Sequence, residues 1–285
     1  MTNPFNPSLA STINVVRAAL RDLGHDLPES LTAAMALADT ATKVPATLRP
    51  DSAKAARRWW DLYTSGKDPA RDPEILGLLT RNTEAVRGLE LSLAELAEAT
   101  KAEALAEAAD PIVETLQGVV TEAQEHIDEA RERIGLVITE TRVSGLSPDN
   151  VRLHARAREA FVRTDLARRA WVALAKQFGR ANWRPGHAEE ILIFADLDLA
   201  GLSEIAGRVG RARSAGAVVP TLDKYDARTV IATGHRLDLA DFDSFRERLA
   251  LVAEEAQRQH DAEKKQARKK AHDGIDPARM HATLL

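Results

Sequence analysis

The residues with the best metal-binding chemistry in this chain are histidines close to glutamates. Two groups qualify: Glu122, Glu125, His126 and Glu129, and His187, Glu189 and Glu190. A di-metal site in a helical bundle needs a Glu-x-x-His pair on each of two helices, and the sequence contains no such pair. Since a bound ion requires three or four converging ligands, we predict no metal and no cofactor.

The sequence also lacks the residues that usually carry out covalent catalysis or bind a nucleotide. The chain has no cysteine, which excludes disulfides, thiolate metal sites and a cysteine nucleophile. No serine lies in the glycine-flanked turn of a nucleophile elbow, and no glycine-rich loop follows a strand and opens a helix. We therefore predict that the protein is not an enzyme. An enzyme built from scattered residues is our third hypothesis.

Basic segments offer another kind of chemistry, contact with phosphates or with an acidic partner. Residues 202–218 have Ala206 and Gly210 at helix-turn-helix spacing, but Arg211 and Gly216 occupy positions that need apolar residues. The candidate contacts for nucleic acid or an acidic partner are Arg152, Arg156, Arg163, Arg208, Arg211, Lys264, Lys265 and Lys269. A nucleic-acid-binding protein that uses the basic helix 152–176 and the segment 202–218 is thus the alternative function.

Aromatic and basic residues also gather at positions 57–63, which include Arg58, Trp59 and Trp60. Rings beside arginines can stack on single-stranded nucleic acid or on a peptide. A tryptophan pair on an amphipathic helix is more often one buried and one half-buried ring at a helix junction. We favour the second interpretation.

The elements that position these residues are predicted to be helices. Aromatic residues make up only 4% of the chain, so the core must come from Leu, Val, Ile and Ala, which favours close-packed helices. We predict an all-α fold, a multi-helix bundle with a long central antiparallel, coiled-coil-like hairpin. The two apolar stripes of this hairpin contain Ile75, Leu79, Asn82, Val86, Leu89, Leu93, Leu96 and Thr100, and Leu116, Val120, Ala123, Ile127, Ala130, Ile134 and Val137.

The hairpin is expected to turn or kink at Asp110 and Pro111. A proline inside a helix removes a backbone hydrogen bond, and an aspartate before a proline is a good N-cap. We therefore predict one helix over about 74–108 and a second over 111–134. The predicted protein interface consists of Leu89, Leu93, Leu96, Leu116, Val120, Ile127 and Ile134.

Caps and apolar spacing predict the remaining helices. They are expected from Asn6-Pro7 to Gly24, after Pro28, and over 51–63, 148–178, 187–196, 202–213, 223–233 and 241–272. Residues 136–143 have β preference without a partner strand, so we expect an extended connection or a continued helix. We divide the chain into an N-terminal helical segment, 1–72, the long hairpin, 73–143, and a C-terminal helical domain with a basic last helix, 144–285.

Charge is segregated into blocks, although the net charge is only −4. The hairpin is acidic, the helix over 152–176 is basic, and the last helix becomes lysine-rich after Gln259. Opposite charge predicts that the hairpin and the basic helix pack together, within one molecule or between subunits.

Long heptad stripes, charge blocks and the lack of a chemical site favour a non-enzymatic structural or assembly protein. We expect it to act through protein-protein contacts in a homo-oligomer or larger assembly, as a virus-particle component or scaffold does. Nucleic acid is the less favoured partner. The N-terminus has no basic segment followed by an apolar run, and the apolar piece 191–195 is too short to cross a bilayer. We therefore expect no membrane partner, and a location in the cytoplasm or within a virus particle.

Overall fold

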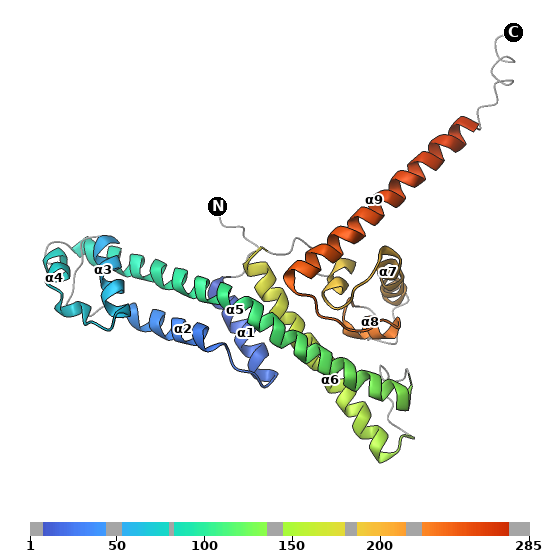
Figure 1. Ribbon diagram of the computed structural model, residues 1–285, viewed down its shortest axis with the longest axis horizontal. Helices are drawn as coiled ribbons and strands as arrows, with labels where there is room; N and C mark the ends of the chain where they lie inside the picture. Colours follow the sequence, from blue (N-terminus) through green and yellow to red (C-terminus); the bar gives the residue numbers. More distant parts are fainter. Residues whose placement is uncertain are drawn as a thin grey trace, which may run out of the picture. The chain divides into compact units, whose positions relative to one another are not determined.

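The computed structural model describes residues 8–43, 53–79, 83–135, 145–179, 187–214 and 224–273, which form helices and no strand (Figure 1). The predicted all-α fold is confirmed. The helices are α1 (Leu9–Asp22), α2 (Glu29–Ala41), α3 (Ala53–Thr64), η1 (Pro69–Arg71), α4 (Pro73–Leu79), α5 (Thr83–Ile134), α6 (Pro148–Gln177), η3 (Ala188–Ile193), α7 (Leu199–Ser214), α8 (Ala227–Ala232) and α9 (Phe242–Asp273). The predicted connection 136–143 lies outside the described residues.

Polar caps begin several of these helices, as their residue types require. The hydroxyl of Ser8 accepts from the backbone N–H of Ser11 at the start of α1, where the sequence suggested Asn6, which lies outside the described residues. Asp226 accepts from the N–H of Thr229 at the start of α8. Each cap satisfies a donor that the first helical turn leaves free.

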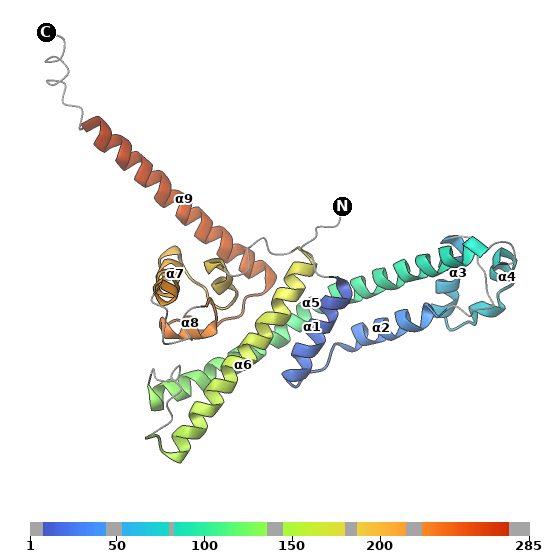
Figure 2. The ribbon, with the colours of Figure 1, turned by 180° about the vertical axis from the view of Figure 1, so that it is seen from behind.

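The long hairpin is present, but its turn is not where the sequence placed it. Helix α5 continues through Pro111 as one helix of 52 residues, so the predicted turn or sharp break at Asp110 and Pro111 is wrong. The second arm is α6, which packs against α5 (Figure 2). The residues that flank the proline, among them Ala109 and Ile112, are buried. Their burial offsets the one hydrogen bond that the proline cannot donate.

Contacts divide the chain into two compact units. Unit 1 comprises residues 1–119 and 166–180, and unit 2 comprises residues 120–165 and 181–285. Helices α5 and α6 therefore each contribute to both units. The division into three domains at 72/73 and 143/144 stays a prediction, and the compact units divide the chain elsewhere.

A cluster around Trp59 forms part of the core of unit 1. Trp59 is 4% exposed and belongs to one cluster with Ala56, Ile75, Leu89 and Leu93, while Trp60 is half-buried against it. The interpretation of the tryptophan pair as one buried and one half-buried ring is confirmed. These rings pack on α4 and α5 residues, which explains why this short aromatic segment is needed.

An arginine fork joins α3 to the start of α4 in unit 1. Arg58 donates two hydrogen bonds of 2.9 Å to the two carboxylate oxygens of Asp72. Asp72 also accepts from the backbone N–H groups of Glu74 and Ile75 and so caps α4. The hydrogen bonds from Arg58, followed by those from the backbone, lower the pKa of Asp72 to about 2.

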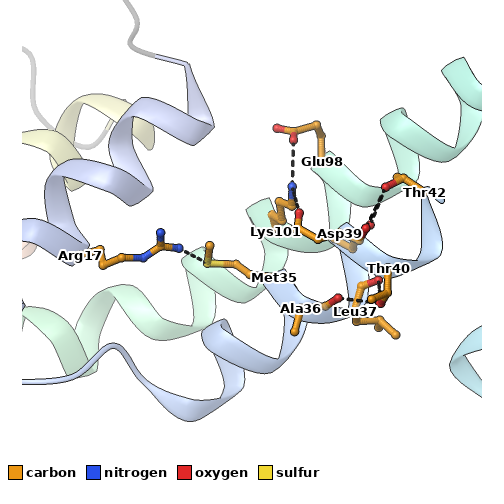
Figure 3. Close-up of polar contacts among 10 residues, drawn as sticks. Arg17, Met35, Ala36, Leu37, Asp39, Thr40, Thr42, Glu98 and Lys101 are labelled. Carbon is orange, nitrogen blue, oxygen red and sulfur yellow. Dashed lines mark hydrogen bonds and ion pairs between the residues drawn. The ribbon is translucent and has the colours of Figure 1, made fainter.

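A lysine links α2 to α5, also within unit 1. The ammonium group of Lys101 on α5 lies 3.1 Å from a carboxylate oxygen of Asp39 on α2 and 3.5 Å from one of Glu98 (Figure 3). At the C-terminal end of α2, the hydroxyls of Thr40 and of Thr42, the residue after the helix, donate to carbonyls one turn earlier. The ion pair between Lys101 and Asp39 therefore adds an electrostatic contact between α5 and α2.

Unit 2 is organised around a buried arginine on α9. Arg248 donates to the carbonyl oxygens of Leu192 and Asp238 at 3.0 and 3.1 Å and pairs with the Asp238 carboxylate. The backbone N–H groups of Asp238 and Ala240 donate to the carbonyls of Phe194 and Ile193 respectively. The first turns of α9, η3 and the segment before α9 are thereby held together.

Candidate interaction surface

The predicted interface residues lie in the core of the chain's own helices. Leu89, Leu93, Leu116, Val120 and Ile127 are buried, and the remaining two, Leu96 and Ile134, are half-buried. Their stripe therefore packs within this chain. The predicted protein interface stays a prediction, and this structure shows five of its seven side chains covered by the chain itself.

The basic residues of α6 serve two different purposes. Arg163 pairs with Glu122 of α5 at 3.0 Å within unit 2, so it helps to join the two arms of the hairpin. Arg152 and Arg156 are exposed, and Arg152 pairs with Asp149 of its own helix at 3.6 Å. The prediction that the acidic and basic helices pack together is confirmed within one molecule.

The histidine and glutamate pair on α5 is part of this junction. His126 Nε2 lies 3.8 Å from the Glu122 carboxylate, which the guanidinium of Arg163 also contacts. A cavity of about 190 Å³ is lined by Ala123, His126, Arg156, Glu159, Ala160 and Arg163. The guanidinium groups of Arg156 and Arg163 line this cavity, and their positive charge disfavours the binding of a cation there. Within the described ranges, no group of three or more His, Asp or Glu side chains could hold a metal ion.

The segment 202–218 does not form a helix-turn-helix in its described part. Helix α7 runs without interruption to Ser214, so Gly210 lies inside a helix where the motif requires a turn. Burial of Leu202 and Val209 on one face of α7 supports the continuous helix. Arg208 donates to the carbonyl of Ala232 at the end of α8, whereas Arg211 is exposed. Residues 215–218 lie outside the described part of the chain.

Helix α9 has a buried first part and an exposed second part. Its first turns are anchored by buried Phe242, Phe245 and Val252, and the Glu255 carboxylate accepts from the N–H of Leu199 at 3.0 Å. From position 256 to 267 every side chain is exposed. Among the described residues of unit 2, no other helix lies beside this part of α9 in either view (Figures 1 and 2). We call residues 256–273 the α9 extension.

The α9 extension is helical for local reasons. It is built from strong helix formers, Ala, Gln, Glu, Lys and Arg, and Gln257 donates to Asp261 one turn later at 3.1 Å. Basic residues near its C-terminal end interact favourably with the helix dipole. Lys264 and Lys265 are exposed, and the side chain of Lys269 lies outside the described residues. A helix of this length without tertiary burial is only marginally stable in water.

Arg248 is the residue that sequence reasoning missed. It lies between Phe245 and Val252, on the inward side of an amphipathic helix, where a charge is costly unless it is paired. The sequence places an arginine at an inward position of an apolar stripe, and this pattern indicates a buried side chain that is held by hydrogen bonds. Its partners could not be predicted, because two of them are the backbone carbonyls of Leu192 and Asp238, and a carbonyl is present at every position of the sequence.

Comparisons with protein-family models, curated proteins and solved structures found no match to this chain. None of the helices, searched over the described residues, is long and apolar enough to cross a membrane.

Proposed function

We propose that this chain is a non-enzymatic structural or assembly component that acts through protein-protein contacts, with the α9 extension as its principal contact surface. The observation that carries the proposal is the run of twelve consecutive exposed side chains on one helix, residues 256–267. A helix that is polar on all sides and packs on nothing contributes little to the stability of its own fold. Contact with another molecule gives such a helix a role.

The packing of the other helices supports the same proposal. Large apolar side chains of their stripes, such as Leu93, Leu116 and Ile127, are already buried within this chain. An assembly contact then has to use surface helices. We propose a homo-oligomer or larger assembly, of the kind formed by scaffolds and virus-particle components, in the cytoplasm or within such a particle.

The test compares two truncations of the full chain by sedimentation velocity at micromolar concentration. A variant that ends at Asp273 keeps the α9 extension, and a variant that ends at Glu255 lacks it. We expect the full chain and the Asp273 variant to assemble and the Glu255 variant to sediment as a monomer. If the full chain is a strict monomer that also retrieves no protein in pull-downs, the proposal is refuted.

The alternative is nucleic-acid binding, which the exposure of Arg152, Arg156 and Arg211 favours. Phosphate contacts release counterions, so binding of this kind weakens steeply as salt rises. The test is retention of DNA and RNA at low salt, followed by a salt titration. Absence of retention at low salt would exclude the alternative.

A further inference from the structure

We propose that the second half of α9 pairs side by side with the same helix of a second copy, in antiparallel orientation. The inference rests on the proposed function and deepens it, because it names the partner of the α9 extension. Four exposed, charged side chains carry it, Glu254, Arg258, Asp261 and Lys265, which we call the charge ladder.

The charge ladder occupies one side of α9. Its members follow each other at i, i+4, i+7 and i+11, which is the spacing of residues on one helix face, and they span about 16 Å along the axis. Their charges alternate from negative to positive twice along this face. In each half of the ladder an acid precedes a base by four residues, which supports the helix locally. The same alternation decides how a second copy can lie against it.

An antiparallel second copy places an opposite charge against every member of the charge ladder. With the two-fold axis between positions 259 and 260, Glu254 faces Lys265 of the second copy, and Arg258 faces Asp261 of the second copy. Each of these contacts occurs twice by symmetry, so the pair contains four ion pairs. A parallel second copy would place each residue opposite itself, and all four contacts would then repel. The charge ladder therefore favours the antiparallel pair.

The charge ladder keeps donors and acceptors for a partner. Among the described residues, neither the Glu254 carboxylate nor the Lys265 ammonium group has an ion-pair partner. Arg258 donates through Nε to the carbonyl of Glu254 at 3.4 Å, which leaves its two terminal NH₂ groups. One carboxylate oxygen of Asp261 accepts from Gln257 at 3.1 Å, which leaves the other oxygen. Each member can thus form the contact that the antiparallel pair requires.

An exposed leucine lies at one end of the same face. Leu251 precedes Glu254 by three residues, so it lies on the ladder side of α9, and it is 60% exposed. In the antiparallel pair this side chain lies against the last turns of the second copy's helix. The contact therefore removes apolar surface from water at both of its ends.

A second copy suits this face better than nucleic acid does. The carboxylates of Glu254 and Asp261 alternate with the bases, and phosphates would be repelled by both. In the antiparallel pair each carboxylate instead faces a base. Both copies use the same residues, so the contact is isologous and closes as a dimer.

The experiment measures self-association of the full chain by sedimentation velocity, with charge reversals at the two ends of the ladder. Glu254→Lys and Lys265→Glu each turn two attractive contacts of the pair into repulsive ones, so each should raise the dissociation constant by about tenfold or more. An equimolar mixture of the two variants should associate again, because a copy with two bases at these positions then meets a copy with two acids. A swapped chain that carries both changes should associate like the wild type.

The matched controls are exposed charges outside the ladder. Glu263 lies nine residues from Glu254, on the opposite side of the same helix, and Arg211 lies on α7. Glu263→Lys and Arg211→Glu should leave association unchanged. A mixture of Glu263→Lys with Lys265→Glu should not recover the affinity of the wild type.

The outcomes separate this inference from the proposed function. Association that is lost in each single reversal and regained in the mixture supports the antiparallel pair. Association that survives both single reversals overturns it while the proposed function stands, and so does a loss that neither the mixture nor the swapped chain repairs. A wild-type monomer that binds a different protein also overturns the pair alone. A strict monomer without any protein partner overturns both, and retention of single-stranded polynucleotide by that monomer favours nucleic acid instead.

Discussion

Replacement of Pro111 by alanine should stabilise the protein, because the structure places this proline inside a continuous helix. Proline has no N–H to donate to the carbonyl of Glu107, and its ring crowds that carbonyl. Pro111 itself is exposed, so the substitution removes no buried packing. The change therefore tests the backbone of α5 alone.

The magnitude follows from two opposing terms. A proline in a helix interior is about 3 kcal/mol less favourable than alanine. The substitution also frees the unfolded chain, which costs about 0.4–1 kcal/mol of stability. We therefore expect Pro111→Ala to raise the free energy of unfolding by about 2 kcal/mol.

Urea unfolding followed by the helical circular-dichroism signal measures this difference. Pro148→Ala is the matched control, since Pro148 is the first residue of α6, where proline is favourable. The control should change the free energy of unfolding little or lower it slightly. A loss of stability in Pro111→Ala would refute the reasoning, because that is the result expected if a helix began at Pro111.

Three further predictions concern single polar residues. Arg248→Ala leaves the carbonyls of Leu192 and Asp238 without their donor, so urea unfolding should show a loss of about 2–4 kcal/mol, and Arg248→Lys should lose less. Burial raises the pKa of Asp226, so its ionisation costs stability as the pH rises through the folded-state pKa. Asp226→Asn should therefore match or exceed the wild type at pH 7, whereas Asp226→Ala should lose about 1 kcal/mol with the helix cap. The pKa of Asp72 is about 2, against 3.8 ordinarily, so its contribution is complete above pH 3.8 and disappears as the pH falls through about 2. An acid titration of stability should show this loss in the wild type and not in Asp72→Asn.

The sequence predicted the helical class and most inward positions, since these depend on local properties. Helix propensity and 3.6-residue spacing are present in every segment of the chain, and they placed Leu89, Leu93 and Ile127 in the core correctly. For the tryptophan pair the sequence predicted one buried and one half-buried ring, and the structure shows that Trp59 is the buried one. Stretches such as α6 and α9 were predicted close to their observed bounds for this reason.

One local signal, Pro111, predicted a break that the structure does not contain, whereas Gly210 lies inside the helix that the sequence predicted over 202–213. Pro111 and Gly210 each disfavour a helix, by about 3 and 1 kcal/mol respectively. Both lie on helices whose neighbouring residues, including Ile112 and Val209, are buried. Burial of a few large apolar side chains exceeds such penalties, and it depends on partners from distant segments. A short window of sequence does not contain those partners.

Local spacing was thus sufficient to say that this chain forms amphipathic helices and which side of each is apolar. Tertiary packing decided what covers those sides: the stripes of α5 are buried within the chain, Arg248 contacts the carbonyls of Leu192 and Asp238, and the described side chains of 256–267 on α9 are exposed. The physical reason is that helix formation depends on neighbours within a few residues, whereas burial depends on residues that the fold brings together from far along the chain.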